Sequence, residues 1–182
     1  GDRRQRRLTA ANASPVTSTC KECCTKPLTP LDPDDADSIA MEGGYDPWFW
    51  LTRCTTEIQE GTACFRSNVE AAGREFVLTS SLRTAWYQRH FTEIWDKYEA
   101  LKKDKTPACA ATRTKVMYER DSKHRIRHEP ARGIEPRHVD GRAIDISYRQ
   151  IGLSVADLDA RADTCGLYRR VATDKHHYEV KP

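Results

Sequence analysis

One long stretch of the chain has the apolar periodicity of an amphipathic helix. Over residues 84–103, five apolar or aromatic residues recur at spacings of four and three: Tyr87, Phe91, Ile94, Tyr98 and Leu101. This spacing places the five side chains on one face of an α-helix. We expect the helix to pack this face against a sheet and to hold the strand that precedes it.

Four shorter stretches are rich in β-branched, aliphatic and aromatic residues, and this composition predicts strands. They cover residues 75–80, 143–147, 167–171 and 174–180. A turn through Thr173 and Asp174 separates the last two stretches, so we expect these two strands to form a hairpin.

Two more helices are predicted from their end signals. Residues 66–73 look like a short helix, because Gly73 suits a C-terminal cap. Another helix begins at Ser154, where Asp157 gives a start like a capping box, and ends near Gly166. Residues 104–135 are charged and contain prolines, and we interpret them as an irregular insertion that borders a cleft.

The order of these elements predicts an α+β fold, with a small, mixed or mainly antiparallel sheet and helices packed on it. The 182 residues are enough for one domain with an appendage. We divide the chain into a flexible basic arm over residues 1–19, a cysteine-rich extension over 20–74 and a main domain over 75–182. The aromatic cluster at residues 43–50 fits core packing under this extension.

Charge and hydropathy exclude some classes of function. The net charge is +3, from 30 basic and 27 acidic residues, which is too small to indicate nucleic-acid binding. No apolar run approaches the roughly 20 residues of a membrane span. We therefore expect neither a nucleic-acid partner nor a membrane-spanning segment.

Seven cysteines in a polar chain indicate an oxidising compartment and disulfides. The odd number leaves at least one thiol free or paired between chains. Zinc binding by Cys20 and Cys23 with two later cysteines is an alternative, as are reduced cysteines. The pairing cannot be derived from the sequence.

The chemistry of the chain is concentrated around His138, Gly141 and Asp145. Asp145 lies in the apolar strand at 143–147, where an ionised carboxylate is costly unless it is paired or binds a metal. Gly141 permits a tight turn that brings His138 back beside the strand. An imidazole nitrogen and a carboxylate oxygen would then face one point.

A third ligand is expected from the strand near the C-terminus. His177 lies there, and Asp174 precedes it by three residues. His138, Asp145 and His177 would bind one Zn²⁺ per chain and leave a fourth position for water. Asp174 is then the candidate general base, which passes the proton to a leaving amine.

These residues resemble the zinc D-alanyl-D-alanine peptidases, a family that includes D,D-dipeptidases and L-alanyl-D-glutamate endolysins and shares its fold with the hedgehog signalling domain. Its first motif, Ser-x-His-x-x-Gly-x-Ala-x-Asp, is matched by His138, Gly141, Ala143 and Asp145, with Pro136 in place of the serine. Its second motif, acid-x-x-His, is matched by Asp174 and His177. The resemblance covers about residues 76–180.

A third matching segment lies upstream, where Ser81 and Arg83 end a strand and Gln88 follows in the helix. The resemblance implies that Arg83 faces the active site and stabilises a substrate carbonyl or carboxylate. A fixed guanidinium suits an oxyanion. In this segment Ser81 replaces the usual glycine and Leu82 the usual aromatic residue.

The resemblance implies a secreted, periplasmic or cell-wall-associated enzyme that cleaves peptidoglycan stem peptides, with D-Ala-D-Ala carboxypeptidase activity favoured. The alternatives are an L-Ala-D-Glu endopeptidase and a non-catalytic zinc module for binding. His176 is either a competing ligand or a helper in the transition state. Glu179 would buttress His177, since alternation along the strand puts both on one face and His176 on the other.

Three other histidines receive no role in this interpretation. His90 flanks the apolar face of the long helix, where a histidine is usually structural or solvated. His124 and His128 lie among basic residues, including Lys123, Arg125 and Arg127. We interpret that segment as a solvated loop, with contacts to an anionic polymer as the alternative.

Overall fold

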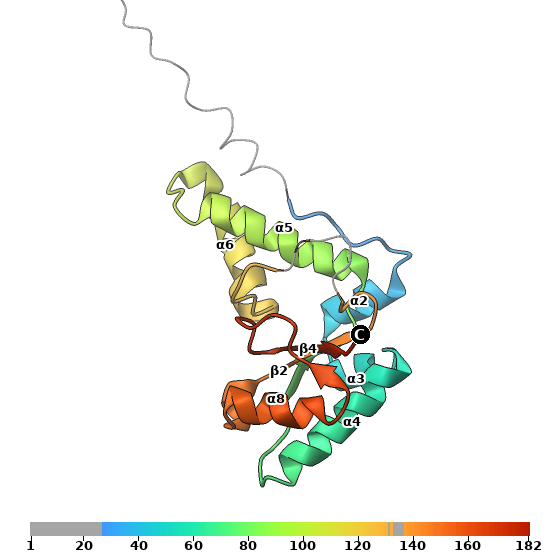
Figure 1. Ribbon diagram of the computed structural model, residues 1–182. Helices are drawn as coiled ribbons and strands as arrows, with labels where there is room; N and C mark the ends of the chain where they lie inside the picture. Colours follow the sequence, from blue (N-terminus) through green and yellow to red (C-terminus); the bar gives the residue numbers. More distant parts are fainter. Residues whose placement is uncertain (1–26, 131, 133–136) are drawn as a thin grey trace, which may run out of the picture.

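The computed structural model describes residues 27–130, 132 and 137–182, which form an α+β fold (Figure 1). The predicted arm over 1–19 lies outside the described residues, as do Cys20, Cys23, Cys24 and Pro136. A four-stranded antiparallel sheet stands next to a group of helices, as the sequence predicted. The division of the chain at residue 75 stays a prediction.

The sheet has the strand order β1-β2-β4-β3. The strands are β1 (Leu78–Ser80), β2 (Ala143–Ile146), β3 (Leu167–Tyr168) and β4 (His177–Val180). Each neighbouring pair is antiparallel, and β3 and β4 form the predicted hairpin. In the central pair, Ile144 lies opposite Tyr178 and Asp145 lies opposite His177.

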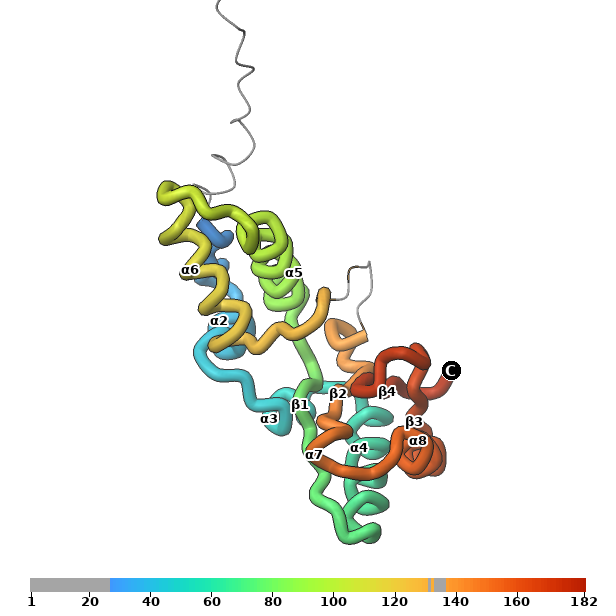
Figure 2. Tube along the Cα trace, turned by 90° about the vertical axis from the view of Figure 1, so that its left-hand side faces the viewer, coloured from blue at the N-terminus to red at the C-terminus, as the bar shows by residue number. Residues whose placement is uncertain are grey.

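One face of the sheet forms the main hydrophobic core with two helices, α4 (Thr56–Glu70) and α8 (Val155–Asp163) (Figures 1 and 2). Ile144 and Tyr178 are fully buried on this face. The ring of Phe65, from α4, lies 5.2 Å from that of Tyr178. Because side chains alternate along a strand, this core turns Asp145 and His177 toward the other face.

A second group of helices lies above the sheet in the view of Figure 2. It comprises α2 (Ala36–Gly43), α5 (Ala85–Leu101), the 3₁₀ turn η1 (Pro107–Cys109), α6 (Ala110–Tyr118) and the π-helix η2 (Glu119–Lys123). Two short helices, α3 (Pro47–Leu51) and α7 (Tyr148–Ile151), follow α2 and β2.

The long predicted helix is confirmed as α5, but its predicted packing is wrong. Its apolar stripe contacts α6, η2 and α2 rather than the sheet. Leu101 is buried with Val116 of α6, and Tyr87 with Met41 of α2. Periodicity identifies the apolar face of a helix but does not identify what covers it.

Two other predictions need correction. The helix predicted over 66–73 begins ten residues earlier, at Thr56, and ends at Glu70. Residues 107–123 are helical rather than an irregular insertion. The signals at helix ends were more reliable: Ser154 caps α8 as predicted, and Gly73 has a positive φ after α4. Thr84, predicted as the first residue of the long helix, is the residue that caps α5.

A disulfide joins α4 to the turn between α8 and β3. Cys64 and Cys165 are bonded across a sequence separation of 101 residues. Cys109 is also disulfide-bonded, while Cys54 is free and buried. The expectation of disulfides with at least one unpaired thiol is confirmed.

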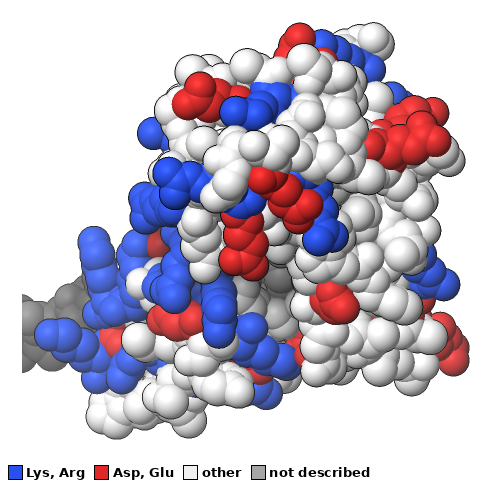
Figure 3. Space-filling model, turned by 90° about the horizontal axis from the view of Figure 1, so that it is seen from below, with Lys and Arg blue, Asp and Glu red and all other residues white. Residues whose placement is uncertain are grey.

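The surface carries charges of both signs close together, with basic side chains more crowded on one side of the face in Figure 3. Within the described part of the chain, no helix has both the length and the apolar character that a membrane crossing requires.

We expect the double substitution Cys64→Ser with Cys165→Ser to lower the free energy of unfolding by about 2–4 kcal/mol. The disulfide restricts the unfolded chain over 101 residues, and its loss releases that restriction. Urea denaturation of the oxidised proteins measures the change. Ser67→Ala, at an exposed position of α4, is the control with little expected effect. Equal stability of the double variant and the wild type would contradict the prediction.

Candidate metal centre

His138, Asp145 and His177, the three predicted ligands, converge at one point. Asp145 and His177 face each other across β2 and β4, on the side of the sheet away from the core. His138 reaches them from the loop that precedes β2. One ligand atom from each residue lies within 4.8 Å of the other two, so the group could hold a metal ion.

The loop that brings His138 to the sheet depends on Gly141. Its φ is +63°, a left-handed conformation that glycine adopts without strain. The Gly141 N–H bonds to the His138 carbonyl, and the Gly141 carbonyl accepts from Thr55 N–H at 3.0 Å. The Arg83 N–H donates to the same His138 carbonyl, which ties this loop to the segment after β1.

In each of the two imidazoles, one ring nitrogen contacts an acceptor outside the group of three. The other ring nitrogen is therefore left to face Asp145. His138 Nδ1 lies 2.7 Å from the Ser81 carbonyl, which can only accept, so Nδ1 carries the proton. His177 Nε2 lies 3.0 Å from the Glu179 carboxylate. His138 Nε2 and His177 Nδ1 then face Asp145 Oδ1, at 3.1 and 3.0 Å. Such outer contacts orient histidine ligands in metal sites.

Asp145 is the electrostatic centre of the group. Burial opposes its charge, but His138, His177 and Arg83 together hold the pKa of Asp145 well below its usual range. Burial likewise opposes the charged form of His177, yet the carboxylates of Asp145 and Glu179 raise the pKa of His177. Asp145 is therefore a carboxylate at neutral pH, which is the form that binds a cation.

Arg83 lies against the same carboxylate. Its guanidinium contacts Asp145 Oδ2 at 3.1 Å and the Gln88 side-chain oxygen at 3.3 Å. Gln88 and Ser81 are both buried. Gln88 thus orients Arg83, while Ser81 orients His138 through its backbone carbonyl.

A cavity of about 970 Å³ opens beside this group. Asp145 and Arg83 line it, together with Asp174 and His176. Asp174 is exposed, and its carboxylate accepts a hydrogen bond from the His176 backbone. The His176 ring contacts the Ile146 carbonyl at 2.8 Å and stands outside the converging group of three.

The donor set fits a divalent metal ion. Two imidazole nitrogens and one carboxylate oxygen are the ligands of many catalytic zinc sites, which use three protein side chains. The two contacts from Ser81 and Glu179 prepare the histidines for that role. The group also lies beside a cavity, where a substrate would reach it.

A second group of side chains that could hold a metal ion was not foreseen from the sequence. It consists of Glu42, His90, Glu119 and His124. The sequence predicts a solvated loop around His124 and no role for His90, whereas the structure places His124 after the π-helix η2 and His90 on α5, both facing this group. The local signal is the five-residue spacing of Glu119 and His124, which is the hydrogen-bond spacing of a π-helix, a conformation too rare to be predicted from the sequence.

Comparison of the chain with family models, with curated proteins and with solved structures finds no match. The function is therefore argued from the geometry of the site and from the resemblance of its motifs.

We expect Gly141→Ala to destabilise the fold by about 1–3 kcal/mol, the usual cost of a strained backbone conformation. A Cβ at this position would lie 3.0 Å from the Cys54 Cα, and φ is already in the left-handed region. Urea denaturation measures the loss. Gly43→Ala is the matched control, because its Cβ would meet nothing within 4 Å. Similar stability of both variants would show that the turn does not require glycine.

Proposed function

We propose that the chain is a zinc-dependent peptidase that removes the terminal D-alanine from peptidoglycan stem peptides, with the hedgehog-like fold of the D-alanyl-D-alanine peptidases. The observation that carries the proposal is the convergence of His138 Nε2 and His177 Nδ1 on Asp145, with both outer nitrogens already bonded. The motif resemblance supplies the substrate class. A secreted, periplasmic or cell-wall location would follow from that substrate, and the disulfides agree with it.

Within this proposal, Zn²⁺ bound by the three ligands would polarise the scissile carbonyl and acidify the attacking water. Asp174 accepts the proton of that water. The hydroxyl adds to the carbonyl carbon, the C–N bond breaks, and Asp174 returns the proton to the leaving amine. Arg83, fixed by Gln88, faces the cavity and stabilises the developing oxyanion.

The cation Arg125 favours a carboxypeptidase over an endopeptidase. It is exposed and lines the same cavity as Asp145, while the ion pairs among the described residues do not involve it. The neighbouring Lys123, by contrast, is paired with Glu42 and Glu119. Arg125 is therefore available for the free carboxylate at the end of a stem peptide.

The proposal is tested by incubating the protein with a synthetic stem pentapeptide that ends in D-Ala-D-Ala, with and without a zinc chelator. Mass spectrometry should show chelator-sensitive loss of one D-alanine. A cut between L-Ala and D-Glu would instead indicate the endopeptidase. No cleavage, while His138→Ala still loses bound zinc, would leave a binding module.

We expect Asp174→Ala to lower kcat by about 10²–10⁴-fold, the usual contribution of general acid–base catalysis. Zinc content should stay at the wild-type value, because Asp174 lies outside the converging ligands. Hydrolysis rates and elemental analysis measure the two quantities. Glu75→Gln, an exposed acid away from the cavity, is the control. Unchanged hydrolysis in Asp174→Ala would reject this residue as the base.

We expect Arg125→Ala to raise KM for the free pentapeptide about two- to fivefold, since an exposed ion pair is worth up to about 1 kcal/mol. An endopeptidase substrate with an amidated C-terminus should show no such change. Steady-state kinetics with both peptides measure the difference. Arg74→Ala, at an exposed position outside the cavity, serves as control. A KM that is insensitive to Arg125 would remove the argument for carboxylate recognition.

A further inference from the structure

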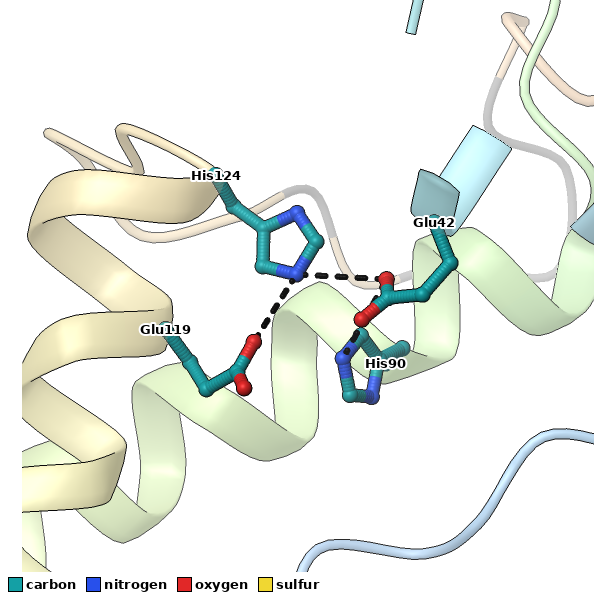
Figure 4. A group of neighbouring side chains, drawn as sticks. All are labelled: Glu42, His90, Glu119 and His124. Carbon is teal, nitrogen blue, oxygen red and sulfur yellow. Dashed lines mark ion pairs between the residues drawn. The ribbon is translucent and has the colours of Figure 1, made fainter. Parts of the chain in front are cut away.

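Four side chains from the helical part of the molecule point toward one another in Figure 4: Glu42, His90, Glu119 and His124. Glu42 comes from α2 and His90 from α5. Glu119 begins the π-helix η2, and His124 follows its end. One ligand atom of each residue lies within 4.8 Å of the other three.

The four ligand atoms are buried and make no hydrogen bond within the described structure. They are Glu42 Oε2, His90 Nε2, Glu119 Oε2 and His124 Nε2. The His124 side chain is only 2% exposed and that of His90 6%. A buried polar atom without a hydrogen bond is costly, and four that face one point indicate a missing common partner.

The two imidazoles are suited to act as neutral ligands. Burial lowers the pKa of both His90 and His124, despite the nearby carboxylates. His124 Nδ1 lies 3.1 Å from the Tyr87 hydroxyl, which fixes the ring and turns Nε2 inward. His124 Nε2 then lies 3.3 Å from both Glu42 Oε2 and Glu119 Oε2. In the tautomer in which Nδ1 donates to the Tyr87 hydroxyl, the Nε2 lone pair faces both carboxylates, an arrangement that a cation between them would stabilise.

The local backbone is shaped to bring Glu119 and His124 together. The His124 N–H bonds to the Glu119 carbonyl, five residues back, at 2.9 Å. Such π-turns are rare and are frequently found at functional sites. Arg125, directly after, has a φ of +52°, a conformation that non-glycine residues seldom adopt.

Lys123 is the one ammonium group beside the cluster among the described residues, and it does not replace a metal ion. Its Nζ pairs with the other Glu42 oxygen, Oε1, and lies 3.3 Å from Glu119 Oε2. With two carboxylates, one ammonium and two neutral imidazoles, the cluster keeps a net negative charge. The ammonium pairs with the two carboxylates only, so His90 Nε2 and His124 Nε2 stay without a hydrogen-bond partner among the described residues.

We propose that Glu42, His90, Glu119 and His124 bind a second divalent metal ion, with Zn²⁺ as the ion that their two nitrogens and two oxygens suit best. Four protein ligands close a tetrahedral shell, which is typical of structural rather than catalytic zinc. The ion would hold α2, α5 and η2 together. Glu42 and His124 also line the large cavity, so the site would stabilise the wall that carries Arg125.

The site is tested on the full chain by loading with Zn²⁺, removing loose metal by gel filtration and measuring bound zinc by mass spectrometry. We expect His138→Ala to retain one zinc per chain. Adding His124→Ala or Glu119→Gln to that variant should abolish retention. Adding Glu99→Gln, an exposed acid of α5 paired with Lys102, should not. Circular dichroism confirms that each variant is folded.

Binding by His138→Ala alone decides between the two sites. If that variant retains no zinc, or retains it equally with and without His124→Ala, this inference is wrong. If the wild type and His138→Ala both retain one zinc per chain, and His124→Ala removes it, this inference stands and the proposed peptidase centre fails. Co²⁺ substitution gives an independent readout: His138→Ala should show the intense visible absorption of a tetrahedral site, and Glu119→Gln in the same background should lose it.

Discussion

The buried carboxylate of Asp145 imposes the constraint on which the rest of the site depends. A charge in this position requires partners, and the structure supplies two imidazoles and one guanidinium from three different segments. Each partner is fixed by its own element: His177 by the register of β4, His138 by the Gly141 turn, and Arg83 by its place between β1 and α5. The main role of the short sheet is therefore to bring these three segments together.

The molecule places its two candidate metal groups on different structural supports. The group at Asp145 stands on the outer face of the sheet, and the other lies among helices whose apolar stripes pack on one another. Residues of both groups line one cavity, so a ligand in that cavity would contact residues of the sheet and of the helices. The relative position of α5 and β2 then controls the shape of the site, and Arg83, at the start of α5, contacts both.

Local sequence patterns were enough to predict the elements that are determined by neighbouring residues along the chain. The strands around Asp145 and His177, the cap at Ser154 and the turn at Gly141 all follow from side-chain period and backbone preference. The partner of the α5 stripe was not predictable, because an apolar face can be covered equally well by a sheet or by helices. Glu42 and His124 are 82 positions apart with no intervening motif, so only the tertiary fold reveals their proximity.

Cys54, which packs against the Gly141 turn, bears on the redox chemistry of the chain. Cys54 is the free thiol of the described residues, and burial raises its pKa to about 11. The thiolate is the species that attacks disulfides and binds soft metals, and at neutral pH it is almost absent here. An odd cysteine in an oxidising environment usually endangers a protein through disulfide exchange. In this chain burial keeps Cys54 in its unreactive thiol form, so the described residues hold no accessible free thiol that would exchange with the bond between Cys64 and Cys165.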